Sequence, residues 1–244
     1  MPRRRDGDDG GAQEAMRYAA LRRLLPGPVR RHILYFEWRV EESVAAFAGS
    51  LAPEARVLDA GAGECRHAGL FARQRYCGVD FAAGDPSWDY SRLDCVADLA
   101  ALPFSDGAFD ACLNVVTLEH VREPGVVLRE LARTLKPGGR LLLVVPHAWE
   151  IHQAPHDYYR YTRYGVAYLL GSAGLELLSI EAIGGYFRFL SRQLLNGLQF
   201  FRGVWFAAAA LLLAPPALLV PLLDRLDRER IFTLGYICTA RKPS

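Results

Sequence analysis

Lysine is almost missing from this chain of 244 residues, in which arginine supplies all of the 29 basic residues except Lys136 and Lys242. The 27 acidic residues nearly cancel this charge and leave a net charge of +2. Proteins that bind nucleic acid through its phosphates carry a clear basic excess, so the charge balance argues against a nucleic-acid partner. Hydrophobic residues make up 51% of the chain, which excludes a disordered protein and is ample for a folded core.

The sequence also lacks any Cys-x-x-Cys pair, and its five cysteines are an odd number. Both facts argue against a zinc site or a disulfide framework and favour reduced thiols in a cytoplasmic protein. Residues 1–11 are charged and no apolar stretch follows them directly. We therefore expect a flexible tail there, and not a secretory signal.

Short apolar runs alternate with helical patterns along most of the chain. The run 140–145 is apolar throughout, as expected for a parallel strand that is buried on both faces. The alternation predicts an α/β fold, a Rossmann-like doubly wound sheet that is mostly parallel and has helices on both faces. The predicted strands cover 56–59, 76–80, 95–97, 109–114, 140–145 and 175–183, and the predicted helices cover 12–25, 28–47, a stretch from Gly63 to Arg75, 124–135 and 162–173.

The first predicted strand ends in Asp59, which is followed by Gly61 and Gly63. Glycines at the end of such a strand let a ligand approach the backbone closely. A dinucleotide-binding turn would need a third glycine where this chain has Arg66. Asp59 would also repel a phosphate, whereas it suits a positively charged nucleoside. These two residues argue against an NAD-dependent dehydrogenase.

The glycine turn resembles the first motif of class I S-adenosylmethionine-dependent methyltransferases, and the resemblance extends over about 55–145 to the subgroup that includes quinone-biosynthesis methyltransferases. Cys65 is a departure, because the family usually has its third glycine there. The resemblance implies methyl transfer from S-adenosylmethionine and a last, antiparallel strand, which we expect within 231–241. The other segments that carry it are Tyr76–Asp80, Ala97–Asp110, Asn114–Val121 and Leu135–Gly139.

The same resemblance implies which residues hold the cofactor. Asp80 would bind the ribose hydroxyls, and Asp98 with the backbone of Leu99 would meet the adenine. Taken alone, each of these acids could instead cap a helix or form a turn. The implied cofactor-binding residues are Asp59, Gly61, Gly63, Asp80, Phe81, Asp98, Leu99 and Asn114.

Histidines follow the fourth and fifth predicted strands, at the edge of the sheet where the cofactor would lie. Histidine titrates near neutral pH, which suits a general base that deprotonates a methyl acceptor. We predict His156, Tyr159 and His147 as catalytic residues, with Arg160 facing an anionic or carbonyl group. The alternative is that this segment only leads into a helix capped by Thr162.

Metal binding is the other chemistry that these histidines could support. The spacing of His147, His152 and His156 fits no standard ligand pattern, and no cysteine lies among them. The sequence therefore predicts no metal site.

The segment after the fourth predicted strand limits the class of methyl acceptor. Methyltransferases that act on amide or adenine nitrogen typically have Asn/Asp-Pro-Pro-aromatic there, whereas this chain reads Asn114-Val-Val-Thr117. We therefore expect an oxygen or carbon acceptor in a small or lipid-linked molecule. The alternative function is a catalytically silent S-adenosylmethionine-binding module that recruits partners.

Residues 204–223 carry no charge and are long enough to span a membrane. A single crossing would place the last strand on the wrong side of the bilayer, and Pro215 and Pro216 are expected to break the helix. We therefore predict a helical hairpin with arms over 194–213 and 216–226 that touches the inner face of the cytoplasmic membrane through 200–223. A soluble lid or a homodimer interface is the alternative.

These readings divide the chain into four parts. The parts are a tail (1–11), N-terminal helices (12–52), a methyltransferase domain (53–192 and 231–244) and an apolar hairpin (193–230).

Overall fold

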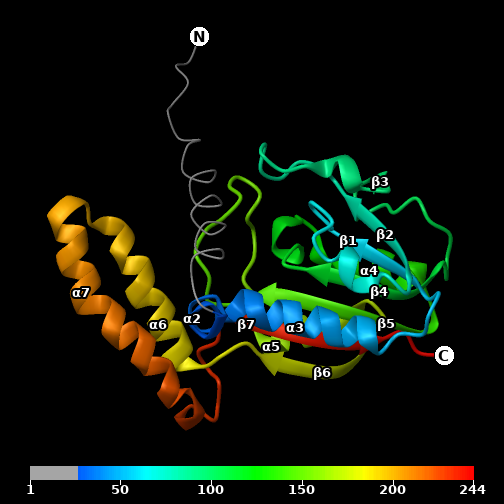
Figure 1. The fold of residues 1–244 in the computed structure, drawn as a ribbon. Coiled ribbons are helices and arrows are strands. Elements are labelled where there is room, and N and C mark those ends of the chain that lie inside the picture. The colour runs from blue at the N-terminus through cyan, green and yellow to red at the C-terminus, as the bar shows by residue number, and fades with distance from the viewer. Residues whose placement is uncertain (1–26) are drawn as a thin grey trace.

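The protein, seen here in a computed structural model that describes residues 27–244, forms one seven-stranded sheet (Figure 1). The strand order is β3-β2-β1-β4-β5-β7-β6, and β7 runs antiparallel to both β5 and β6. The predicted Rossmann-like, mostly parallel sheet with an antiparallel last strand is confirmed. The strands are β1 Arg56–Ala60, β2 Arg75–Asp80, β3 Cys95–Val96, β4 Phe109–Val115, β5 Leu135–Pro146, β6 Glu176–Ala182 and β7 Gly235–Arg241.

Helices cover both faces of this sheet, and the tail and helix predicted within 1–25 lie outside the described residues. The α-helices are α2 Gly27–Ile33, α3 Tyr35–Gly49, α4 Pro124–Thr134, α5 Arg163–Ser172, α6 Tyr186–Asn196 and α7 Gly203–Leu219. The 3₁₀ helices are η1 Ala68–Phe71, η2 Tyr90–Arg92, η3 Leu118–His120, η4 Gly197–Phe200 and η5 Val220–Leu226.

Alternate residues of the central strands pack into two separate hydrophobic cores, one on each face of the sheet. Leu141 and Leu143 of β5 pack in the core shared with α4 and α5, whereas Leu142 and Val144 pack in the core shared with α3. This alternation is why β5 reads as an uninterrupted apolar run. Burial on both faces fixes the register of the sheet and thereby the position of its carboxyl edge.

The connection after β1 differs from the prediction. A helix was expected from Gly63 to Arg75, but only the four-residue η1 forms there. Gly63 and Cys65 both have positive φ angles, of 51° and 54°, so the chain turns sharply before any helix can begin.

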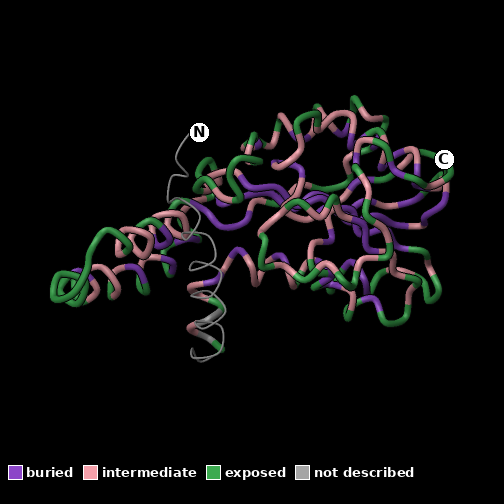
Figure 2. Tube along the Cα trace, turned by 90° about the horizontal axis from the view of Figure 1, so that it is seen from above, coloured by how far each residue is buried: buried purple, intermediate pink, exposed green. Residues whose placement is uncertain are grey.

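A helical hairpin, built from α6 to η5, projects away from the sheet (Figures 1 and 2). The hairpin begins at Tyr186, whereas the prediction began it at residue 193. The prediction started later because it followed the apolar run, and the amphipathic helix α6 does not belong to that run. The predicted break at Pro215 and Pro216 is wrong, since both prolines lie inside α7. The chain reverses instead between η4 and α7, where Gly203 has a φ of 56°.

Candidate active site

The carboxyl ends of β1, β2 and β4 bring the predicted cofactor residues to one edge of the sheet. Gly61 follows β1 directly with a φ of 88°, and its N–H donates to the Val79 carbonyl at 2.8 Å. A Cβ at Gly61 would lie 2.2 Å from Cγ2 of Thr117, which follows β4. Only glycine fits this position, so the turn approaches the neighbouring loop as closely as a backbone can.

Asp80 closes the turn from the end of β2. One of its carboxylate oxygens accepts the Gly63 N–H at 2.9 Å, and the other accepts the Ala82 N–H at 2.8 Å. The side chain is half-buried, and Phe81 beside it is 64% exposed. The site thus offers a fixed carboxylate next to an open aromatic face.

Asp59 lies at the buried end of β1, with a hydrogen bond at 2.7 Å from the Tyr76 hydroxyl. Burial raises the pKa of Asp59 to about 6; the Tyr76 hydrogen bond opposes this and the nearby Asp80 charge adds to it. A cation bound beside these two carboxylates would relieve their repulsion.

The remaining predicted cofactor residues differ in exposure. Asp98 is exposed and accepts the Ala100 N–H at 2.9 Å, whereas the Leu99 side chain is buried in the core. Asn114 is fully buried at the end of β4, where its Nδ2 donates to the Ala60 carbonyl at 2.8 Å. Its Oδ1 has no partner among the described residues and is left as a buried acceptor.

The family comparison agrees with this geometry. Residues 58–143, which run from β1 to β5, match the family described as a methyltransferase domain. The chain contains a class I methyltransferase domain. S-adenosylmethionine is the cofactor of this class.

Sequence relatives extend the comparison beyond the family match. A demethylmenaquinone methyltransferase from Renibacterium salmoninarum is 35% identical over 117 residues, which cover 43% of this chain and 46% of that protein. A ubiquinone biosynthesis O-methyltransferase from Xanthomonas oryzae pv. oryzae is 49% identical over 55 residues, which cover 22% of each protein. The chain therefore spans less than half the length of these curated relatives.

A solved structure shares the fold over the whole chain. The 1,6-didemethyltoxoflavin-N1-methyltransferase of Burkholderia thailandensis, solved with its acceptor and S-adenosylhomocysteine, has a TM-score of 0.54. The alignment covers 100% of this chain and 94% of that one, with 17% sequence identity. At that identity, the likeness describes the architecture alone.

The residues at the edge of the sheet fit an S-adenosylmethionine molecule. Asp80 presents a carboxylate for vicinal hydroxyls, and the glycine at 61 lets the turn pack directly against Thr117. The orphaned Oδ1 of Asn114 can accept a hydrogen bond, and Asp59 and Asp80 suit a group with positive charge. The predicted cofactor residues are therefore compatible with the cofactor that the domain class uses.

The three predicted catalytic residues lie on the segment that follows β5. Nδ1 of His147 lies 2.7 Å from the Tyr161 carbonyl, so this nitrogen carries the proton and Nε2 is left as the basic atom. Nδ1 of His156 lies 3.0 Å from the Tyr158 hydroxyl, and the Tyr159 hydroxyl donates to the Arg122 carbonyl at 2.8 Å. His156 and Tyr159 are exposed, whereas His147 is half-buried at the strand end.

Part of the alternative interpretation of this segment also holds. Thr162 caps α5 by accepting the Gly165 N–H at 3.1 Å. Arg160 pairs with Asp157 at 2.6 Å and donates to the carbonyl of Glu150. Burial opposes ionisation of Asp157, but hydrogen bonds from Arg160 and the His152 N–H lower its pKa to about 2. Arg160 thus holds the loop together and does not point freely toward an acceptor.

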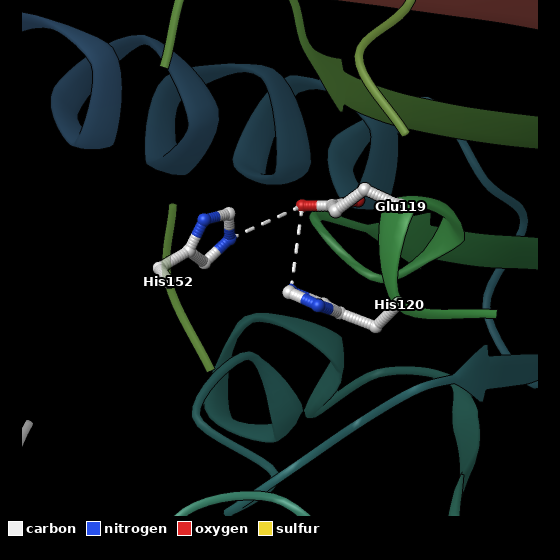
Figure 3. Close-up of side chains that lie close together, drawn as sticks. All are labelled: Glu119, His120 and His152. Carbon is white, nitrogen blue, oxygen red and sulfur yellow. Dashed lines mark ion pairs between the residues drawn. The ribbon is translucent and has the colours of Figure 1, made fainter. Parts of the chain in front are cut away.

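Sequence reasoning missed a second group of polar side chains. His152 does not group with His147 and His156; it meets His120 and Glu119 instead (Figure 3). Burial lowers the pKa of His120, whereas for His152 the opposing effects of Glu119 and the Glu150 carbonyl outweigh burial and raise the pKa. The sequence signal that could have indicated this group is the adjacent pair Glu119 and His120, which follows β4 at the same edge of the sheet as the glycine turn.

Proposed function

We propose that this chain transfers a methyl group from S-adenosylmethionine to an oxygen or carbon of a lipophilic or lipid-linked acceptor at a membrane surface. The observation that carries the methyl-transfer part is the closed glycine turn, in which Gly63 donates to Asp80 beside the buried Asp59. The bound cofactor would supply a methyl group already activated on a sulfonium. The chain's own task is then to align the acceptor, exclude water and take up a proton.

The acceptor proton has a candidate base at the end of β5. With its Nδ1 held by the Tyr161 carbonyl, His147 presents Nε2 as the acceptor of a proton. His156 and Tyr159, on the loop that follows, would form the outer wall of the acceptor site. Two relatives named for quinone methylation support an acceptor of quinone type, with a polar ring and an apolar tail.

The hairpin supports a membrane-bound acceptor. The helical segment Gly203–Leu226 is long and apolar enough, by length and composition, to cross a membrane, and only 17% of its most apolar window is buried in the protein. Trp205, Leu211 and Leu212 are each more than 70% exposed. Free apolar surface of this extent marks a membrane or partner contact.

The attachment of the hairpin argues for contact with one leaflet and against a crossing. Both ends join adjacent strands of one sheet, because α6 follows β6 and η5 leads into β7. Pro215 and Pro216 cannot donate to the carbonyls of Leu211 and Leu212, which favours the hydrated interface over the hydrocarbon core. We propose a peripheral position on the cytoplasmic side of the membrane.

The base of the hairpin also touches the proposed acceptor loop. The Arg192 guanidinium of α6 lies 3.5 Å from the Trp149 ring centre and forms an ion pair with Glu150. The Glu150 carbonyl in turn contacts His152 and Arg160. A membrane-embedded acceptor would therefore reach the acceptor loop along the hairpin.

Label transfer tests this proposal. The full-length protein would be incubated with methyl-labelled S-adenosylmethionine and, separately, with a bacterial lipid extract or the matching aqueous metabolite extract. We expect label in the lipid fraction only. Label in the aqueous fraction alone would overturn the lipophilic acceptor. Binding of S-adenosylhomocysteine without transfer to either extract would favour the catalytically silent module instead.

A further inference from the structure

Glu119, His120 and His152 bring three potential metal-ligand atoms together outside the cofactor residues (Figure 3). Glu119 and His120 belong to η3, and His152 lies on the loop after β5. Oε1 of Glu119 lies 3.7 Å from Nε2 of His120 and 3.6 Å from Nε2 of His152, and all three ligand atoms lie within 4.8 Å of one another.

The carboxylate of Glu119 is buried and lacks a hydrogen bond in the described part of the chain. The residue is fully buried, and within residues 27–244 neither of its carboxylate oxygens has a hydrogen-bond partner. Nε2 of His120 and Nε2 of His152 are likewise buried without a hydrogen bond. A buried ionised carboxylate without hydrogen bonds costs several kcal/mol, and a cation bound between Glu119 and the two histidines would compensate for it.

Backbone carbonyls fix which nitrogen of each imidazole faces the carboxylate. Nδ1 of His120 lies 2.5 Å from the His156 carbonyl, and Nδ1 of His152 lies 3.1 Å from the Glu150 carbonyl. A carbonyl only accepts, so both Nδ1 atoms carry the hydrogen, and in the neutral rings both Nε2 lone pairs point toward Glu119. Metal-ligating histidines are oriented in this way, by a backbone or carboxylate partner on the other ring nitrogen.

We propose that Glu119, His120 and His152 bind a divalent transition-metal ion of the zinc type. Two imidazoles and one carboxylate are a ligand set that zinc uses with a fourth, open position, whereas magnesium prefers oxygen ligands. Ligands about 2.1 Å from a tetrahedral ion lie roughly 3.4 Å apart, so the two separations between Glu119 and the histidines need to close by only a few tenths of an ångström.

The proposed metal site would lie close to the glycine turn that is predicted to hold the cofactor. Thr117, two residues before Glu119, hydrogen-bonds to the Gly61 carbonyl at 3.3 Å, so η3 is anchored to the glycine turn. A hydroxyl of the acceptor bound to the ion would have a lowered pKa and would lose its proton to the proposed base His147 more readily. This role rests on the proposed methyl transfer, but metal binding itself does not.

Metal titration of the full-length protein tests the site. After treatment with a chelator and its removal, Zn²⁺ would be titrated calorimetrically and Co²⁺ would be followed by its visible absorption. We expect one ion per chain, with affinity at least tenfold weaker in Glu119→Gln and in His152→Ala. Glu176→Gln, on exposed β6, is the matched control and should bind as the wild type does. Equal affinity in the wild type and both cluster variants would overturn the proposal, because the ion would then be bound elsewhere.

Thermal unfolding keeps the test independent of catalysis and of folding defects. In the presence of chelator, Glu119→Gln should be at least as stable as the wild type, because a buried charge is removed. Zn²⁺ should raise the Tm of the wild type and not that of the variant. His152→Ala carries the test if Glu119→Gln fails to fold, since His152 is partly exposed.

Cofactor binding separates this proposal from the proposed function. Absence of Zn²⁺ binding in a wild type that binds S-adenosylhomocysteine would remove the metal site and leave methyl transfer standing. Zn²⁺ binding in a wild type that does not bind S-adenosylhomocysteine would support the metal site and remove the methyl-transfer proposal.

Discussion

The α6–η5 hairpin and the carboxyl edge of the sheet depart from ordinary protein packing in opposite directions. The hairpin exposes large apolar side chains, such as Trp205 and Leu211. The sheet edge buries polar ones, namely Asp59, Asn114 and Glu119, each at 1% exposure or less. The strands between them follow the usual rule and bury apolar residues.

Both departures lower stability, and this is what makes them informative. Exposed leucines forgo the free energy of burial, and buried carboxylates lose hydration without a full set of partners. Such costs usually persist where a ligand or a surface compensates for them. The comparison therefore predicts an apolar occupant for the hairpin and polar or charged occupants for the sheet edge.

The strongest way to break this comparison is to make the hairpin polar. Replacing Leu211 and Leu212 together by glutamine should weaken binding to phosphatidylethanolamine–phosphatidylglycerol vesicles by about a hundredfold or more, because each buried leucine contributes about 1.5–3 kcal/mol. Vesicle flotation measures the loss. Leu178→Gln, an exposed leucine of β6, is the matched control. Undiminished flotation of the double variant would leave the hairpin as a lid or dimer contact.

Neutralising Asp59 tests the cost of burying polar groups at the edge of the sheet. The folded-state pKa of about 6 lies above the ordinary value of 3.8, so ionised Asp59 destabilises the fold above both values. Asp59→Asn should therefore raise the free energy of unfolding by about 2–3 kcal/mol at pH 8, and the gain should disappear as the pH falls below about 4. Urea unfolding at several pH values measures this.

A matched control is available on the surface. Asp98→Asn, at an exposed position, should change stability by less than about 0.5 kcal/mol at either pH. If Asp59→Asn proved less stable than the wild type at pH 8, burial of its charge would not be the dominant effect at this position.

Asp80 separates ligand binding from stability at the same edge. Asp80→Ala should weaken S-adenosylhomocysteine binding by about 2 kcal/mol, roughly thirtyfold, because hydrogen bonds to a charged group contribute about 1.5–3 kcal/mol. Calorimetric titration measures the affinity. Asp80→Asn keeps one acceptor oxygen but no charge, so its affinity should lie between those of the wild type and Asp80→Ala. An unchanged affinity in Asp80→Ala would contradict the assignment of the ribose hydroxyls to this residue.

The sequence predicted the sheet well because its strands obey strong, local rules. The apolar run of β5 predicts a buried strand and the Asp59–Gly63 pattern predicts a tight turn after β1. The structure has both at these positions. The hairpin was located by its apolar residues, but its reversal was placed at Pro215 and Pro216. Proline weakens a helix without always ending it, and the glycines at 197 and 203 were the better signal.

The polar site was less predictable, because its residues are neighbours only in space. The candidate acids follow successive strands and could be found from topology alone. The meeting of His152 with Glu119 depends on how the loop after β5 folds back over η3, where the Tyr158 N–H donates to the Glu119 carbonyl. No spacing rule in the sequence encodes that contact.

The smallest effect concerns a place where the hairpin, like the sheet edge, buries a polar side chain, here with a hydrogen bond. The Ser191 hydroxyl of α6 donates to the Ala217 carbonyl of α7 at 2.6 Å, and both residues are buried. Pro221, four residues after Ala217, has no N–H to offer, so Ser191 replaces the missing helical donor. Ser191→Ala should lower the free energy of unfolding by about 1 kcal/mol, whereas Ser191→Thr, which keeps the hydroxyl, should lose less. Equal unfolding curves for Ser191→Ala and the wild type would show that the two helices are held together by apolar contact alone.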